Sequence, residues 1–222
     1  MKQNRFLQKE TQGIDPLWHV QLAVLLAIIL QLVLPDRVAG GFKYDVVILE
    51  AFLLISLVVT TPRVPVFESL IRRLNSVGLV LLVTLANIYS LVRVSEQLLT
   101  SGHVTNGQQL ILASINIYLT NIIIFGLWYW EMDGGGPGRR RNRALSQRDF
   151  LFPQTATPAI APKGWSPTFP DYLYVSATNA TAFSPTDTMP LTHRVKLLML
   201  LQSIVSLVTI ALVAARAVNI LN

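Results

Sequence analysis

The run LILASINIYLTNIIIFGLWYW, from Leu110 to Trp130, contains 21 residues and no charged side chain. A helix needs about 20 apolar residues to cross the hydrocarbon core of a bilayer, which is roughly 30 Å thick. Four further apolar runs of suitable length lie at Leu17–Leu34, Tyr44–Thr61, Leu74–Val92 and Val195–Leu221. The sequence therefore predicts an all-α integral membrane protein with about five transmembrane helices.

The composition supports this fold class. Of the 222 residues, 52% are hydrophobic and 14% are charged, and the mean hydropathy is +0.49. A soluble domain of this size does not need so apolar a balance. The net charge of +6 comes from basic residues that flank the hydrophobic runs, so we expect them to contact lipid headgroups rather than nucleic acid.

The basic residues also predict an orientation. Fourteen of the 18 Lys and Arg residues lie in or beside the N-terminal tail, the second connection and the fourth connection. Four of them, Arg139, Arg140, Arg141 and Arg143, lie close to the end of the fourth run, where such charges count most. The positive-inside rule therefore places the N-terminus and the long fourth connection in the cytoplasm, and the C-terminus outside.

Composition divides the chain into three parts. Residues 1–130 form an N-terminal membrane bundle of four predicted spans. Residues 131–168 are rich in Gly, Arg and Pro and predict a flexible, solvated loop without helix. Residues 169–222 hold the last span, preceded by the apolar and aromatic stretch Asp171–Thr181, which follows Pro170. That stretch is only about three helical turns long, so we expect a short re-entrant helix rather than a span.

Catalytic and cofactor motifs are absent from the sequence. It contains no HExxH, phosphate-loop or GxSxG pattern, and the three histidines lack the spacing of a metal-binding pair. The absence of cysteine excludes disulfides and thiolate metal sites. We expect no enzymatic activity, no metal and no cofactor.

One acid, Glu50, lies inside the second apolar run. A charged side chain at the bilayer centre costs about 2.5–3.5 kcal/mol on insertion scales, so Glu50 needs a partner. In one interpretation Glu50 and Asp45 lie near the interface and pair with Lys43, Arg37 or Arg93. In the other, Glu50 faces a water-filled path for ions or protons.

Neutral polar residues within the third and fourth runs predict hydrogen bonds between helices, each contributing about 0.6 kcal/mol. These residues are Thr84, Asn87, Asn116, Thr120 and Asn121. The aromatic cluster Trp128–Trp130 predicts a belt at the membrane interface.

The last quarter of the chain carries a resemblance. From Phe169 to Leu221 the order is an aromatic short helix, a Thr-containing turn, Asp-x-x-Pro and a long apolar helix. This order resembles the pore module of tetrameric potassium channels, and Thr181, Asp187 and Pro190 match it. Ser184 and Thr186 stand where such channels have filter glycines.

The resemblance implies a pore site, permeant monovalent cations and a homo-oligomer, with a tetramer as the expected assembly. The implied pore-lining or filter-like residues are Thr178, Thr181, Ala182, Phe183, Ser184, Pro185, Thr186, Asp187 and Pro190. The motifs Trp130–Pro137 and Asp149–Pro153 also resemble uncharacterised bacterial multi-pass membrane proteins, some of them ion-channel-like. They imply a location in a bacterial cell membrane.

Three functional hypotheses remain open from the sequence. The first is a channel-derived membrane protein, an ion channel or pore with altered or lost potassium selectivity. The second is a non-conducting structural or accessory membrane protein that docks a partner through the same segment. The third is a secondary transporter, for which the sequence lacks an internal repeat. Potassium channels place the pore loop outside the cell, whereas the positive charges here place it inside.

Overall fold

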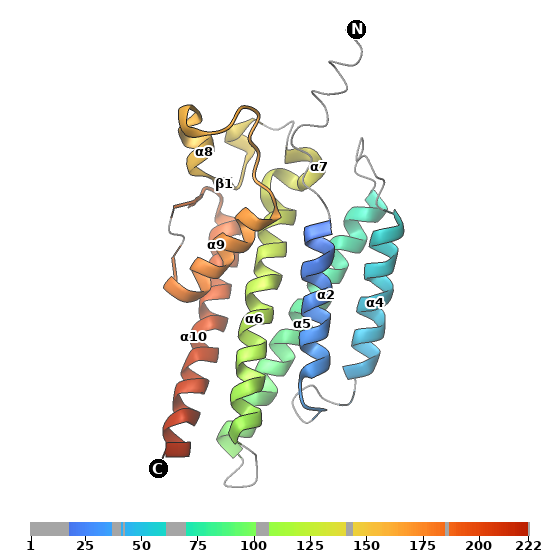
Figure 1. Cartoon of the computed structure of the whole chain (residues 1–222), viewed down its shortest axis with the longest axis vertical. Coiled ribbons are helices and arrows are strands. Elements are labelled where there is room, and N and C mark those ends of the chain that lie inside the picture. Colours follow the sequence, from blue (N-terminus) through green and yellow to red (C-terminus); the bar gives the residue numbers. More distant parts are fainter. Residues whose placement is uncertain are drawn as a thin grey trace.

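The structure is a computed structural model that describes residues 18–36, 41, 43–60, 70–100, 107–140, 144–184 and 187–221. Five long helices lie side by side and run alternately up and down (Figure 1). They are α2 (Trp18–Val33), α4 (Lys43–Thr60), α5 (Leu70–Thr100), α6 (Gly107–Met132) and α10 (His193–Leu221). Each corresponds to one predicted apolar run, so the mostly helical fold is confirmed.

Three segments are long and apolar enough to cross a membrane: Arg73–Gln97, Gln109–Arg140 and His193–Ala215. The two remaining long helices are less typical of spans. The helix α2 has only 16 residues, and α4 carries two acids and one lysine within its 18 residues. Both nevertheless lie against the longer helices, α2 against α4 and α6, and α4 against α5.

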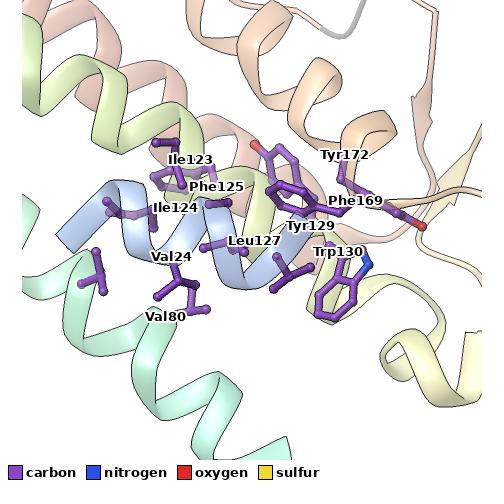
Figure 2. Packing of buried hydrophobic residues seen from close by; sticks show 14 of the residues in the cluster. Val24, Val80, Ile123, Ile124, Phe125, Leu127, Tyr129, Trp130, Phe169 and Tyr172 are labelled. Atoms are coloured by element: carbon purple, nitrogen blue, oxygen red, sulfur yellow. The ribbon is translucent and has the colours of Figure 1, made fainter. Parts of the chain in front are cut away.

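The helix α6 is the centre of the bundle, because it contacts α2, α5, α9 and α10. Of its spanning segment, 67% is buried inside the protein, compared with 28% for α10. Figure 2 shows side chains from three helices meeting in the core, among them Val24 of α2, Val80 of α5 and Leu127 of α6. The helix α10 therefore exposes much more of its apolar surface than α6 does.

The predicted aromatic belt is wrong for two of its three residues. Tyr129 and Trp130 are buried in the core (Figure 2), and only Trp128 is partly exposed. The reason is that α9 and the preceding connection cover this end of α6 and provide the rings with protein neighbours, including Phe150 against Tyr129.

The connection after α6 is ordered into short elements, and the expectation of a helix-free, solvated linker is wrong. Its elements are η1 (Asp133–Gly135), α7 (Pro137–Arg140), η2 (Leu145–Gln147), β1 (Phe150–Leu151), α8 (Pro153–Ala156) and η3 (Pro158–Ile160). The physical reason is burial: Phe150 and Phe152 pack against the ring of Tyr172, with centroid distances of 6.0 and 5.2 Å. These aromatic contacts fix a chain whose composition alone is that of a linker.

The helix α9 (Phe169–Ala182) and the strand β2 (Met189–Pro190) complete the fold. In Figure 1, α9 lies obliquely against α6 and α10 and descends from the upper end of the bundle, and the chain then returns to that end before α10 begins. The strand β2 pairs antiparallel with β1, with Phe150 opposite Pro190 and Leu151 opposite Met189. We call the segment from residue 168 to residue 192 the α9 hairpin.

Candidate functional site

Local sequence signals define where α9 begins. Thr168 is the N-cap, and the carboxylate of Asp171 accepts hydrogen bonds from the Thr168 amide at 2.7 Å and from its hydroxyl at 2.9 Å. Pro170 occupies the first turn, where its missing N–H costs nothing. This capping box satisfies donors that would otherwise be orphaned at the helix start, so Thr168, Pro170 and Asp171 together set the entry point of the hairpin.

The hairpin reaches about a third of the way along α10. Ser176 donates a 2.7 Å hydrogen bond to the carbonyl of Ile122, and Asn179 donates to the carbonyl of Met199 at 3.0 Å and to Gln202 at 2.8 Å. Gln202 lies nine residues beyond the start of α10 at His193, which is roughly 14 Å along a helix axis. Asn179, near the end of α9, therefore lies about a third of the way along α10, which has 29 residues.

Four buried polar side chains hold α9 against α6 and α10, and we call them the polar seam: Tyr129, Ser176, Asn179 and Gln202. The amide oxygen of Gln202 accepts hydrogen bonds from Tyr129 and Asn179. The amide nitrogen of Gln202 donates to the hydroxyl and to the carbonyl of Ser176, at 2.7 and 3.0 Å. Because both ends of the Gln202 amide are satisfied, the seam fixes how α9 is rotated about its axis.

Above the seam lies a charged network that we call the clasp: Asp133, Arg140, Asp149, Tyr172 and Arg194. All of these are buried except Arg194, which is exposed. The guanidinium of Arg194 binds Asp149 with two nitrogens, at 2.8 and 2.7 Å, and this fork geometry is the stronger kind of ion pair. The Thr192 hydroxyl and the Gly134 amide also donate to Asp149, at 2.6 and 3.0 Å. The clasp thus fastens the start of α10 to the turn after α6.

The environment of Asp149 determines its ionisation. Burial opposes the charged form, but hydrogen bonds from Arg194, Thr192 and the Gly134 amide, with the positive charge of Arg194, outweigh it and hold the pKa of this carboxyl below its usual range. Asp149 is therefore a carboxylate at neutral pH, and its charge is matched by Arg194.

The other acid of the clasp, Asp133, holds both the loop and α9. Its carboxylate accepts hydrogen bonds from the amides of Asp149 and Phe150, at 2.7 and 3.2 Å, and from the Tyr172 hydroxyl at 2.6 Å. Arg140 lies 4.0 Å from the same carboxylate and stacks over the Tyr172 ring at 4.7 Å. Burial raises the pKa of Tyr172, so its hydroxyl stays protonated and remains a donor.

The described filter-like residues lie on the outer surface of the protomer. Thr181, Ala182, Phe183, Ser184 and Asp187 are exposed. Thr178 is half-buried and Pro190 belongs to β2, while Pro185 and Thr186 lie outside the described residues. The structure therefore places Thr181 and the described residues just after α9 on the protomer surface, with Thr178 half-buried beside them.

The hydroxyl groups on this face are already committed as donors. Thr178 donates to the carbonyls of Tyr174 and Val175, at 3.1 and 3.0 Å. Thr181 donates to those of Ala177 and Thr178, at 2.8 and 3.3 Å. Their hydrogens point back into the helix, so the oxygen lone pairs are what these side chains present outward.

Phe183 ends α9 in a left-handed backbone conformation, with φ 54° and ψ 24°. Glycine usually occupies this position, and a residue with a Cβ pays roughly 1–2 kcal/mol there. The Phe183 ring is 46% exposed and borders a hollow of about 440 Å³ between α9, β2 and α10. Lys196, Met199 and Leu207 line the same hollow.

Other predicted polar residues also find partners. Asn116 donates to the carbonyl of Leu30 at 2.7 Å, and Asn121 donates to Ser206 at 2.9 Å. Thr84 accepts from the Trp128 indole at 2.9 Å. The prediction of hydrogen bonds between helices is confirmed for these three residues.

Glu50 has a partner of a different kind from the expected cation. It accepts a 3.1 Å hydrogen bond from the amide of Gln31 on α2. Lys43 instead pairs with Asp36, and Arg93 pairs with Glu96. The expected ion pairs of Glu50 with Lys43 and Arg93 are therefore wrong, because each of these cations has a nearer acid, and Arg37 lies outside the described residues.

Sequence reasoning missed the clasp and most of the seam. Asp149 and Arg194 are 45 positions apart, and Tyr129 and Gln202 are 73 positions apart, so no local pattern pairs them. A usable signal did exist for Gln202, because an amide within an otherwise apolar run needs a partner inside the bundle.

Comparisons with protein-family models, curated proteins and solved structures found no match for the chain.

Proposed function

We propose that this chain is one protomer of a cation-conducting pore in a membrane, with the α9 hairpin as the re-entrant, pore-lining segment. The supporting observation is the position of the α9 end, about a third of the way along α10 and on the protomer surface. With His193 at the membrane boundary, Gln202 lies roughly 14 Å deep in a bilayer core of about 30 Å. Backbone carbonyls at the last turn of a helix need partners, and hydrocarbon offers none. A water-filled path between several copies would supply them.

The polarity of this surface favours cations. The lone pairs of Thr178 and Thr181 face outward, and the C-terminal end of α9 carries about half a negative charge. Asp187 adds a carboxylate on the exposed return segment. Hydroxyl oxygens, carbonyls and one carboxylate are the groups that replace part of the hydration shell of a passing cation.

The outer surface of α10 supports assembly into a homo-oligomer. Its spanning segment is the least buried of the three, and Leu200, Ile204 and Leu207 are exposed beside the hollow under α9. Neighbouring copies that cover this surface would bring several α9 ends around one axis. A tetramer, as the channel resemblance implies, is the proposed assembly.

In this proposal α2, α4, α5, α6 and α10 all cross the membrane of a bacterial cell. The basic residues place in the cytoplasm the end of the bundle that holds the clasp, so the hairpin enters from the cytoplasmic side. Single cysteines in place of Ser146 and Asn222 test this orientation, since the chain has no other cysteine. An impermeant thiol reagent added to intact cells should label the second variant only, and labelling of the first would reverse the orientation.

Ion flux through purified protein in liposomes tests the pore. We expect potassium flux in the wild type that falls several-fold with Asp187→Asn, which removes the exposed carboxylate while keeping its shape. The matched control is Glu96→Gln, which changes an exposed acid near the C-terminal end of α5. This variant should leave the flux unchanged. Absence of flux in the wild type, or an equal loss in both variants, would contradict the proposal.

A non-conducting accessory role is the second candidate, and the conformation of Phe183 favours it. The strained backbone and the half-exposed ring are explained if another membrane protein packs against this ring. A photoreactive amino acid at position 183 distinguishes the two roles. Cross-links between identical chains support the pore, whereas cross-links to a different protein together with no ion flux support the accessory role.

A further inference from the structure

A second feature lies at the opposite side of the bundle, where Glu50 is completely buried. It lies seven residues along α4 from Lys43, or roughly 10 Å along the helix axis. The ammonium of Lys43 marks the polar end of the helix, because it donates to the carbonyl of Leu34 at 2.6 Å and to Asp36 at 3.1 Å. The carboxyl group of Glu50 therefore lies well inside the apolar part of the bundle.

The hydrogen bonding of Glu50 is incomplete. Gln31 donates to Oε1 at 3.1 Å, whereas Oε2 is buried and has no hydrogen-bond partner in the described part of the chain. No described ionisable side chain on the packed helices α2, α4 and α5 forms an ion pair with it. Those side chains are His19, Lys43, Tyr44, Asp45, Arg73, Tyr89, Arg93 and Glu96.

A bound metal ion does not account for Oε2 of Glu50, the oxygen without a described hydrogen-bond partner. Within the described residues, no group of three or more His, Asp or Glu side chains could hold a metal ion. An ionised carboxylate with one amide donor is costly in hydrocarbon, because the amide offsets little of the lost hydration. A proton on Oε2 removes the charge and leaves only a hydroxyl to be accommodated.

A cavity connects this region to the end of the bundle. It has a volume of about 250 Å³ and lies between α2, α4 and α5. Gln31, the partner of Glu50, lines the cavity together with Lys43, Tyr89 and Ser90, and the other walls are apolar. The cavity thus reaches from Gln31, the residue that donates to Glu50, to Lys43 near the bundle end.

We propose that Glu50 is a proton-binding site inside the membrane and exchanges its proton, through this cavity, with the solution at the end where Lys43 lies. A hydronium ion at the cavity gives one proton to the carboxylate and leaves a water molecule, and release is the reverse step. No other bond changes. The site does not depend on the pore function of the α9 hairpin.

Infrared spectroscopy of the purified protein in lipid tests the protonation. The wild type should show the C=O stretching band of a carboxylic acid at pH 7, and Glu50→Gln should lose it. The matched control is Asp45→Asn, at an exposed acid on the same helix, and it should keep the band. Absence of the band in the wild type, or the same band in Glu50→Gln, would overturn the proposal, and the wild-type spectrum needs no variant to fold.

Hydrogen–deuterium exchange of the same band tests the route. Ala86 lines the cavity, so Ala86→Phe should fill it and slow the deuterium shift of the band at least several-fold. The control Ala211→Phe places the same side chain at an exposed position on α10 and should leave the rate unchanged. Equal exchange rates in the wild type and Ala86→Phe would overturn the route.

Discussion

Buried polar groups are paired differently around α9 and around α4, on opposite sides of the bundle. Around α9, the clasp and the polar seam join several segments through charged and neutral hydrogen bonds. One buried nitrogen of the clasp, Nη1 of Arg140, has no hydrogen bond among the described residues but lies 4.0 Å from the carboxylate of Asp133. Around α4, one amide reaches one acid and leaves an oxygen without a partner. A short helix that cannot span the membrane needs such polar anchors to hold its depth, whereas a full-length helix is held by its own apolar surface.

The largest expected effect comes from cutting the clasp. Asp149→Asn removes the buried charge that accepts hydrogen bonds from Arg194, Thr192 and the Gly134 amide. Arg194 is exposed and stays hydrated, so the loss comes from these weakened hydrogen bonds, and we expect it to be roughly 3 kcal/mol in the free energy of unfolding. For a chain of this length that lowers Tm by about 6–12 °C. Thermal unfolding in detergent measures it, with Glu96→Gln, an exposed ion pair, as a control that changes Tm little. Equal shifts in both variants would mean that Asp149 does not hold the start of α10 to the turn after α6.

Acid should weaken the clasp in the same direction. The pKa of Asp149 is lowered in the folded protein, so its contribution to stability is complete above the ordinary Asp value of about 3.9 and is lost as the pH falls through the folded value. Wild-type Tm should therefore fall towards that of Asp149→Asn in strong acid. A difference between the two proteins that does not shrink with falling pH would contradict this assignment.

The polar seam gives the next effect. Gln202→Leu removes the acceptor of Tyr129 and Asn179 and the donor to Ser176, and each buried group left unpaired costs about 1–3 kcal/mol. We expect a net loss of roughly 2–3 kcal/mol. Gln109→Leu, the same change at an exposed position of α6, is the control in the unfolding measurement. A similar stability for the two variants would show that α9 does not rely on the seam.

A steric change probes the same contact without touching a hydrogen bond. A Cβ on Gly126 would lie 3.1 Å from the Cα of Leu173, so Gly126→Ala pushes α9 away from α6 and should cost about 1–3 kcal/mol. Gly78→Ala is the matched control, because a Cβ there meets no atom within 4 Å; it should be neutral or slightly stabilising, since alanine favours helix. Thermal unfolding of both variants measures the effect. If both variants were more stable than the wild type, the close contact between Gly126 and Leu173 would be contradicted.

The smallest expected effect is a gain in stability. Phe183→Gly relieves the left-handed backbone at the end of α9 and should raise the free energy of unfolding of the detergent-solubilised protomer by about 1 kcal/mol. The measurement is again Tm. A decrease would mean that the ring already makes contacts within the protomer that outweigh the backbone strain.

The sequence predicted the long helices well because a run of apolar residues is a one-dimensional signal. It also predicted α9, since Pro170 and Asp171 mark a helix start. The clasp could not be predicted in this way. Gly134, Gly135 and Gly136 have the composition of a linker, yet all three adopt positive φ values that let the chain turn sharply and place Asp133 against the amide of Asp149.

The exposed face of the hairpin was identified only by its resemblance to a pore module, not by any physical pattern. Its residues are Thr, Ser and Ala in an order that suits a surface helix as well as a pore. The sequence could not predict how far along α10 the residue Thr181 lies. That position depends on the hydrogen bond between Asn179 and Gln202, which are 23 positions apart.

The partners of α9 also impose an order of assembly on the growing chain. Ser176 and Asn179 bond to Gln202, and Asp149 bonds to Arg194, so their partners leave the ribosome after α9 itself. Until α10 has been synthesised, a newly made α9 has only its contacts with α6 and the turn after it, through Ile122 and Asp133. The hairpin therefore completes its packing last, and a chain that stops before residue 193 lacks half of the polar contacts that hold α9.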